Sequence, residues 1–110
     1  MGPSKKEYTN DGKILPTLDK LIHEPARLKI IALLYVVESA DFLFIMRQTD
    51  LTYGNFSSHM SKLEAAGYIE IVKDFIGRKP HTMLRLTAKG QAAFKKYRKQ
   101  MKQLINGLPE

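Results

Sequence analysis

The chain has 110 residues, of which 44% are hydrophobic and 26% are charged, and its formal net charge is +7. This length suits one compact domain, and the composition is typical of a folded chain rather than a disordered one. Cysteine is absent, which excludes disulfide bonds, thiolate zinc sites and cysteine nucleophiles and is typical of a protein of the reducing cytoplasm. No segment reaches the ~18 consecutive apolar residues of a transmembrane helix, so we expect no membrane partner.

The positive charge is concentrated in the last third of the chain. Residues 1–74 hold nine Lys and Arg against ten Asp and Glu, whereas residues 75–109 hold nine Lys and Arg and no acidic residue. A one-sided basic field attracts polyanions, so a nucleic acid is a candidate partner. A solvated basic surface without a partner would give the same composition.

The chain begins with a segment that we predict to be a flexible tail, over residues 1–14, followed by a single domain over residues 15–110. A short first helix is expected within residues 15–23, where Thr17 can act as its N-cap. The apolar residues of this segment recur at helical spacing: Leu18, Leu21 and Ile22.

Three further helices follow with short connections. The first of them runs over about 25–38 and opens with a proline, which suits the first turn because its missing N–H would be unpaired there anyway. The next runs over 42–48 behind a cap at Asp41, and the last runs over 53–66 behind a cap at Thr52.

After Gly67, a residue that favours helix ends, the pattern changes to that of β-strands. Residues 68–73 and 83–87 are the predicted strands of a hairpin, joined by a basic loop over 74–82. A final helix is expected over about 88–106. The predicted order is α-α-α-α-β-β-α, a mainly helical chain with a small β-hairpin wing, which is the winged helix-turn-helix fold.

The helix over 53–66 has the features of a DNA recognition helix. It follows another helix after a short turn, and its early outward residues are mostly short and polar, which lets a helix lie close to base edges in the major groove. Asn55 can pair with adenine, and Lys62 is a candidate phosphate contact. Gly54 either permits close approach to a DNA backbone or only weakens the first turn. The candidate DNA contacts of this helix are Thr52, Tyr53, Gly54, Asn55, Ser57, Ser58 and Lys62.

The hairpin loop carries Arg78 and Lys79, which are candidate wing contacts to DNA. A basic wing can follow the backbone and direct an arginine toward the minor groove, where the negative potential is strongest. Two basic residues in a loop are also common in solvated hairpins. The helix-turn-helix directly before the hairpin favours the wing.

The final helix carries an apolar stripe spaced 3, 4, 3, 4, as in a helix that pairs with a second helix. The alternative is that the stripe packs only on its own chain. We expect Phe94 and Tyr97 to pack within the domain, and the later residues to reach a second copy. The predicted homodimer interface consists of Leu15, Leu18, Ile22, Tyr97, Met101, Leu104 and Leu108. A pocket between this helix and the DNA-binding core can accommodate a small apolar effector, although no residue requires one.

Enzyme and metal functions have little support in the sequence. The three histidines, His23, His59 and His81, are 36 and 22 residues apart, and no two of them share a helical turn. No Gly-rich phosphate loop, paired-carboxylate motif or nucleophile elbow is present. We therefore predict no enzymatic activity, no cofactor and no metal.

Residues 51–69 (LTYGNFSSHMSKLEAAGYI) resemble the helix-turn-helix core of the MarR and ArsR winged-helix regulators. Residues 77–80 (GRKP) and 86–90 (LTAKG) are similar to the wing and to the strand-to-helix junction of the same superfamily. The resemblance covers roughly residues 15–105. It is strongest to short winged-helix DNA-binding proteins of archaea and bacteria.

The resemblance implies a dimeric, sequence-specific DNA-binding regulator in the cytoplasm, which often represses transcription. It implies base-reading roles for Tyr53, Asn55, Ser57 and Ser58, and a wing-tip role for Arg78. Many relatives carry a basic residue where Ser58 stands, so the target sequence does not follow from the resemblance. Metal-sensing relatives use cysteine or clustered His and acidic ligands, which this chain lacks. The alternative function is a winged-helix module for protein or RNA binding without specific DNA readout.

Overall fold

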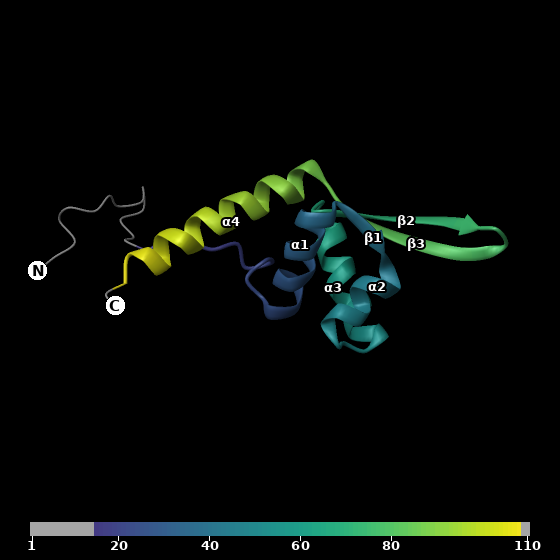
Figure 1. Cartoon of the computed structure of the whole chain (residues 1–110). Helices are drawn as coiled ribbons and strands as arrows, with labels where there is room; N and C mark the ends of the chain where they lie inside the picture. The colour runs from purple at the N-terminus through teal and green to yellow at the C-terminus, as the bar shows by residue number, and fades with distance from the viewer. Residues whose placement is uncertain (1–14, 109–110) are drawn as a thin grey trace, which may run out of the picture.

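The computed structural model describes residues 15–108, and the predicted tail over 1–14 lies outside the described residues. Four helices and three strands share one apolar core (Figure 1). In chain order they are α1 (Pro25–Val37), β1 (Ser39–Asp41), α2 (Phe42–Thr49), α3 (Tyr53–Ala65), β2 (Ile69–Ile76), β3 (Lys79–Leu86) and α4 (Ala88–Asn106). The predicted winged helix-turn-helix fold is confirmed, with one helix fewer and one strand more than predicted.

Local capping groups define the helix starts, as the sequence predicts. Asp41 accepts the N–H of Phe44 at the start of α2, and Thr52 accepts the N–H of Asn55 at the start of α3. Thr87 likewise caps α4. These bonds satisfy backbone donors that have no partner inside the helix. Gly67, with φ of +78°, follows the last turn of α3 in the left-handed conformation that ends helices.

The predicted helix within residues 15–23 is wrong. This segment forms a turn, in which the side chain of Asp19 accepts the backbone N–H groups of Leu21 and Ile22. An Asp side chain that bonds to the backbone in this way competes with helix formation. Ile22 is fully buried in the core of its own chain, so the helical spacing of its apolar residues reflects core packing around a turn.

The three strands form one antiparallel sheet with the order β1-β3-β2. The short strand β1 was not predicted, and it pairs with β3 through Ser39, Ala40 and Asp41. The hairpin strands are longer than predicted, because β2 and β3 stay paired up to a two-residue turn of Gly77 and Arg78. The loop predicted over 74–82 is therefore mostly strand.

The sheet and α4 extend the molecule in opposite directions from the helical core (Figure 1). The hairpin projects at one end and α4 at the other, which gives principal extents of 66 × 25 × 21 Å. At the junction between β3 and α4, a Cβ on Gly90 would lie 2.1 Å from the carbonyl oxygen of Tyr68. Only glycine permits this approach, which sets the direction in which α4 leaves the core. None of the helices in the described part of the chain is long and apolar enough to span a bilayer.

Candidate nucleic-acid interface

Helix α3 has one buried face and one face open to solvent. Phe56, Met60 and Leu63 are enclosed in the core and hold the helix in place. Of the seven predicted contact residues on and before this helix, Ser57 is half-buried and six are exposed: Thr52, Tyr53, Gly54, Asn55, Ser58 and Lys62. The exposed residues of the first two turns form a surface that we call the α3 outer face, consisting of Tyr53, Gly54, Asn55 and Ser58.

Aromatic packing fixes the start of α3 against α2. The rings of Phe42 and Phe56 meet edge to face, with centroids 4.8 Å apart, and the ring of Tyr53 lies 5.7 Å from that of Phe42. Tyr53 is nevertheless 64% exposed. Its ring therefore packs on Phe42 of α2, while most of the residue is available to a partner.

The glycine at position 54 is not required by the packing of the chain itself. A Cβ added to Gly54 would meet no atom within 4 Å. Glycine costs ~1 kcal/mol relative to alanine inside a helix, so its presence on an open surface agrees with close approach by an external partner.

The rear of α3 is supported by a polar cluster of Glu24, Arg27 and His59. Nη1 of Arg27 lies 3.0 Å from Nδ1 of His59, and Nε of Arg27 donates to the carbonyl of Leu21 at 2.6 Å. Glu24 caps α1 by accepting the N–H of Arg27. Burial raises the pKa of Glu24, but the N–H of Arg27 and the nearby His59 and Arg27 charges outweigh it and lower this pKa overall. His59 is therefore a half-buried residue that bonds within its own chain.

The wing places two basic residues at the tip of the hairpin. Gly77 has φ of +63°, which allows the chain to reverse within two residues, and Arg78 and Lys79 follow it. Both basic side chains are exposed. Phe75 and Ile76, beside the turn, are also largely exposed, although the sequence analysis did not single them out. The tip thus combines positive charge with apolar surface.

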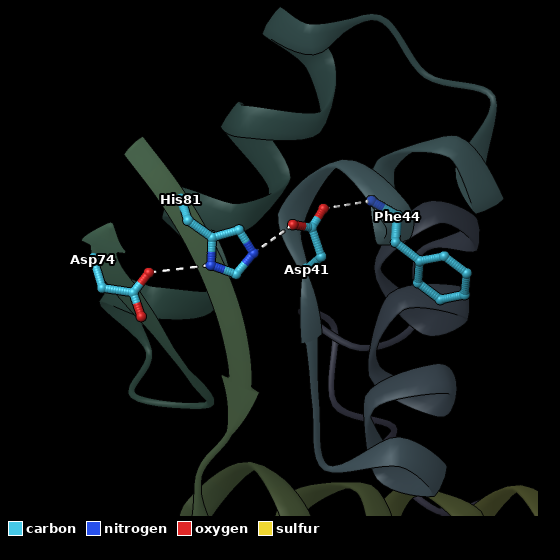
Figure 2. Close-up of polar contacts among 4 residues, drawn as sticks. All are labelled: Asp41, Phe44, Asp74 and His81. Atoms are coloured by element: carbon cyan, nitrogen blue, oxygen red, sulfur yellow. Dashed lines mark hydrogen bonds and ion pairs between the residues drawn. The ribbon is translucent and has the colours of Figure 1, made fainter. Parts of the chain in front are cut away.

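A histidine bridge at the middle of the wing was missed by the sequence analysis. Nδ1 of His81 lies 3.1 Å from Oδ1 of Asp74, and Nε2 lies 2.7 Å from Oδ2 of Asp41 (Figure 2). The other oxygen of Asp41 accepts the N–H of Phe44 at the start of α2. The bond to Asp74, opposed by burial and reinforced by the bond to Asp41, raises the pKa of His81 above its ordinary value. The N–H of Phe44 and the bond from His81 together lower the pKa of Asp41 against the effect of burial.

The residues of this bridge do not form a metal site. Asp41 and Asp74 lie on opposite sides of the imidazole ring, so their oxygens do not converge on one point (Figure 2). Within residues 15–108, no three His, Cys, Asp or Glu side chains are grouped so that they could hold a metal ion.

Comparison with known proteins decides the family. Residues 26–105 match the family model described as winged helix DNA-binding domain. The chain belongs to the winged-helix DNA-binding family. The resemblance that the helix-turn-helix motif indicates is thereby confirmed, and so is the prediction that the protein is related to regulators rather than to enzymes.

Relatives of this winged-helix protein cover most of its length. An uncharacterised protein of Methanocaldococcus jannaschii is 38% identical over 89 residues, which is 81% of this chain and 97% of that protein. The structure of a transcriptional regulator homologue from Pyrococcus horikoshii OT3 is 32% identical, with a TM-score of 0.78 over 84% of this chain and 91% of that one.

A more distant structure, FabT of Streptococcus pneumoniae, was solved in complex with DNA. It is 24% identical, with a TM-score of 0.50 over 83% of this chain and 70% of that one, and the likeness concerns the fold. The family match and the Pyrococcus horikoshii structure show a winged-helix DNA-binding protein similar to transcriptional regulators.

The predicted dimer residues of this winged-helix protein fall into two groups. Ile22 and Tyr97 are buried within their own chain, and the hydroxyl of Tyr97 lies 2.7 Å from Nδ1 of His23. Placing Ile22 and Tyr97 at a partner surface is therefore wrong, because Ile22 is fully enclosed and Tyr97 is only 3% exposed within its own chain. Burial also raises the pKa of Tyr97. The others keep exposed or half-buried surface: Leu15, Leu18, Met101, Leu104 and Leu108.

A groove of about 630 Å³ runs beside α4, from Phe94 to Asn106. Its apolar lining comes from Leu28, Phe94, Tyr97, Met101 and Ile105. Ile105 is 59% exposed and was not predicted as an interface residue, because the 3, 4, 3, 4 spacing selects its neighbour Leu104. Four basic residues of α4 border the groove: Lys95, Arg98, Lys99 and Lys102.

Proposed function

We propose that this winged-helix protein is a sequence-specific regulator of transcription that binds a pseudo-palindromic DNA site as a homodimer and represses. The observation that carries the proposal is the combination of the α3 outer face with a basic wing on one rigid core. The outer face is polar and narrow, which suits entry into a major groove, and the wing supplies charge for the backbone. Repression is the mode that the resemblance to MarR and ArsR regulators favours.

Helix α3 would provide the sequence readout. Asn55 is the third residue of α3 and is exposed, and its side-chain amide can bond to adenine in the major groove. The free N–H groups at the start of α3 and the side chain of Lys62 would contact phosphate. Ser57 is half-buried, so we assign it a smaller role than Asn55 and Ser58.

The outer part of α4 would provide the dimer contact. Its apolar residues extend beyond the core, and a second copy related by a two-fold axis can cover them. Such a pair presents two α3 helices, which must lie about one DNA turn apart, ~34 Å, to read two half-sites.

Selection of bound sequences from a random duplex DNA pool tests the proposal. We expect enrichment of an inverted repeat whose half-sites are about 10 base pairs apart. A control selection with duplex RNA should yield nothing, because the major groove of A-form RNA is too narrow for a helix. Failure to bind any duplex DNA at low ionic strength would overturn the proposal, and equal retention of RNA would favour the alternative module.

A further inference from the structure

The bridge formed by His81 connects the wing to the helix-turn-helix. It reaches from Asp74 on β2, through the ring of His81 on β3, to Asp41 between β1 and α2 (Figure 2). Asp41 is also the cap of α2, so the same carboxylate holds the first helix of the helix-turn-helix. The side chain of His81 is 20% exposed, which shields the bridge partly from water.

The geometry of the bridge requires a particular protonation state. Both partners of the ring are carboxylates, which accept hydrogen bonds when ionised but donate none. Two bonds therefore need a proton on each ring nitrogen, so the bridged ring is the imidazolium. When His81 loses one proton, one nitrogen directs a lone pair toward a carboxylate oxygen, and attraction is replaced by repulsion.

Asp41 and Asp74 are the charged groups that contact the ring of His81, and they therefore favour its protonated form. On the same face of β3, Lys79 lies two residues before His81 and Arg85 four residues after it, and Arg85 pairs with Glu70. Between His81 and Arg85 the same face carries Met83, whose partner on β2 is Val72, and both residues are apolar. The first turn of α2 carries no charged side chain.

We propose that His81 is a positioning residue for DNA binding, which holds the wing in a fixed orientation to α2 as long as its ring is protonated. The inference rests on the proposed function, since it takes the wing to contact DNA. Arg78 lies only three residues before His81, so a change of wing orientation at His81 moves the charged tip relative to the α3 outer face. Because the pKa of His81 is raised above its ordinary 6.5, the full bridge is present below that pH and is lost as the pH rises through the higher value.

The affinity for the selected duplex, measured between pH 5.5 and 8.5 at constant ionic strength, tests the inference. We expect affinity to fall about two- to fivefold from pH 6 to pH 8, the range expected for a partly exposed ion pair. In the double variant Arg78→Ala/Lys79→Ala the wing tip has lost both basic contacts to DNA, so the pH dependence should largely disappear. A wild-type profile that is flat, or one that the double variant leaves unchanged, would overturn the inference.

Two variants, Asp74→Asn and His81→Gln, and one control, His23→Gln, distinguish the bridge from other titrating groups. In Asp74→Asn the amide can donate to the unprotonated ring nitrogen, so the bridge should persist and the pH profile should flatten. The change also removes a negative charge, so the comparison concerns the slope with pH rather than the affinity at one pH. His81→Gln should bind at every pH like the wild type at pH 8, whereas His23→Gln should keep the wild-type profile. A wild-type profile in His81→Gln would contradict the positioning role.

A measurement without DNA distinguishes failure of the inference from failure of the proposed function. Backbone ¹⁵N relaxation of Gly77 and Arg78 reports the order of the wing, and the ring signals of His81 report its protonation. We expect the wing to lose order over the same pH range in which His81 deprotonates, and to keep its order in Asp74→Asn. If no duplex binds but the wing loses order as His81 deprotonates, only the DNA-binding proposal fails. If the wing is equally ordered at pH 6 and pH 8, the role of the bridge is rejected even when DNA binds.

Discussion

Helices α3 and α4 use similar amphipathic patterns in different ways. Helix α3 places Phe56, Met60 and Leu63 in the core, and its remaining surface is mostly polar. Helix α4 buries Phe94 and Tyr97 within its first ten residues and then extends beyond the core, so its later apolar residues have only partial cover. The core thus buries the large apolar side chains of α3 from Phe56 to Leu63, but it covers only the first part of the apolar face of α4.

This difference indicates the kind of partner that each helix fits. The α3 outer face offers hydrogen-bonding groups, an uncovered backbone at Gly54 and a nearby basic wing, which together match a polyanion with readable edges. The outer part of α4 offers apolar surface, which is costly to leave in water and is covered best by another apolar surface. The following variants test this division of roles.

The largest effect is expected for Leu104→Glu. A charge at this half-buried position would be enclosed without a partner in the proposed dimer, which costs roughly 3 kcal/mol, or about a hundredfold in the dimer dissociation constant. Sedimentation equilibrium measures the change. Gln103→Glu adds the same charge at the neighbouring exposed residue and should leave the dimer intact. An unaltered dimer in Leu104→Glu would remove α4 from the interface.

The next effect is expected for Asn55→Ala on α3. Loss of a paired contact to one base should cost ~1–3 kcal/mol in binding and relax preference at one position of the site. Competition binding with single-base variants of the selected duplex measures both. Ser61→Ala, on an exposed position later in the same helix, is the matched control. An equal loss on all duplexes would show a role in general binding instead of base reading.

A smaller effect is expected for Arg78→Ala at the wing tip. Removal of one phosphate contact should lower the slope of log affinity against log salt concentration by about 0.9. Lys96→Ala removes the same charge from an exposed position on α4, at the other end of the molecule, and should change the slope less. An identical slope in the wild type and Arg78→Ala would show that the wing does not touch DNA.

The smallest effect is expected for Gly54→Ala, which should raise the stability of the protein and lower its affinity for DNA. Alanine stabilises a helix relative to glycine by up to about 1 kcal/mol, so the free energy of unfolding should rise. Affinity for DNA should fall, because the added methyl group keeps the helix from its closest approach. Chemical denaturation and binding titration measure the pair. A gain in stability with unchanged affinity would mean that the glycine has no part in contact with DNA.

The sequence pattern was most reliable where structure depends on neighbours along the chain. The caps Asp41, Thr52 and Thr87 and the helix end at Gly67 form through bonds that span only a few residues. The candidate DNA surface was predictable for the same reason, since a capped helix with a polar face is a local pattern. The structure places six of its seven predicted residues at the surface.

The first predicted helix shows how a local pattern can mislead. Leu18, Leu21 and Ile22 have the spacing of a helix face, but Asp19 bonds to the backbone of the same segment and to the hydroxyl of Tyr68. This bond and burial raise the pKa of Tyr68 to about 12, burial being the larger cause. One of the bonds that hold Asp19 in this turn therefore comes from a residue 49 positions away, which no window of the sequence contains.

The helix-turn-helix, the hairpin, the basic last third and the polar outer face of α3 can be predicted from residue types at short spacing. The third strand, the burial of Ile22 and Tyr97, and the bridge of His81 between two aspartates depend on how the elements pack in the folded chain. The bonds among these features join residues from 7 to 74 positions apart, among them His23 with Tyr97 and Asp41 with His81, which are 40 apart. Such pairs form only after the core has closed, because packing of the elements against each other is what brings their side chains within bonding distance.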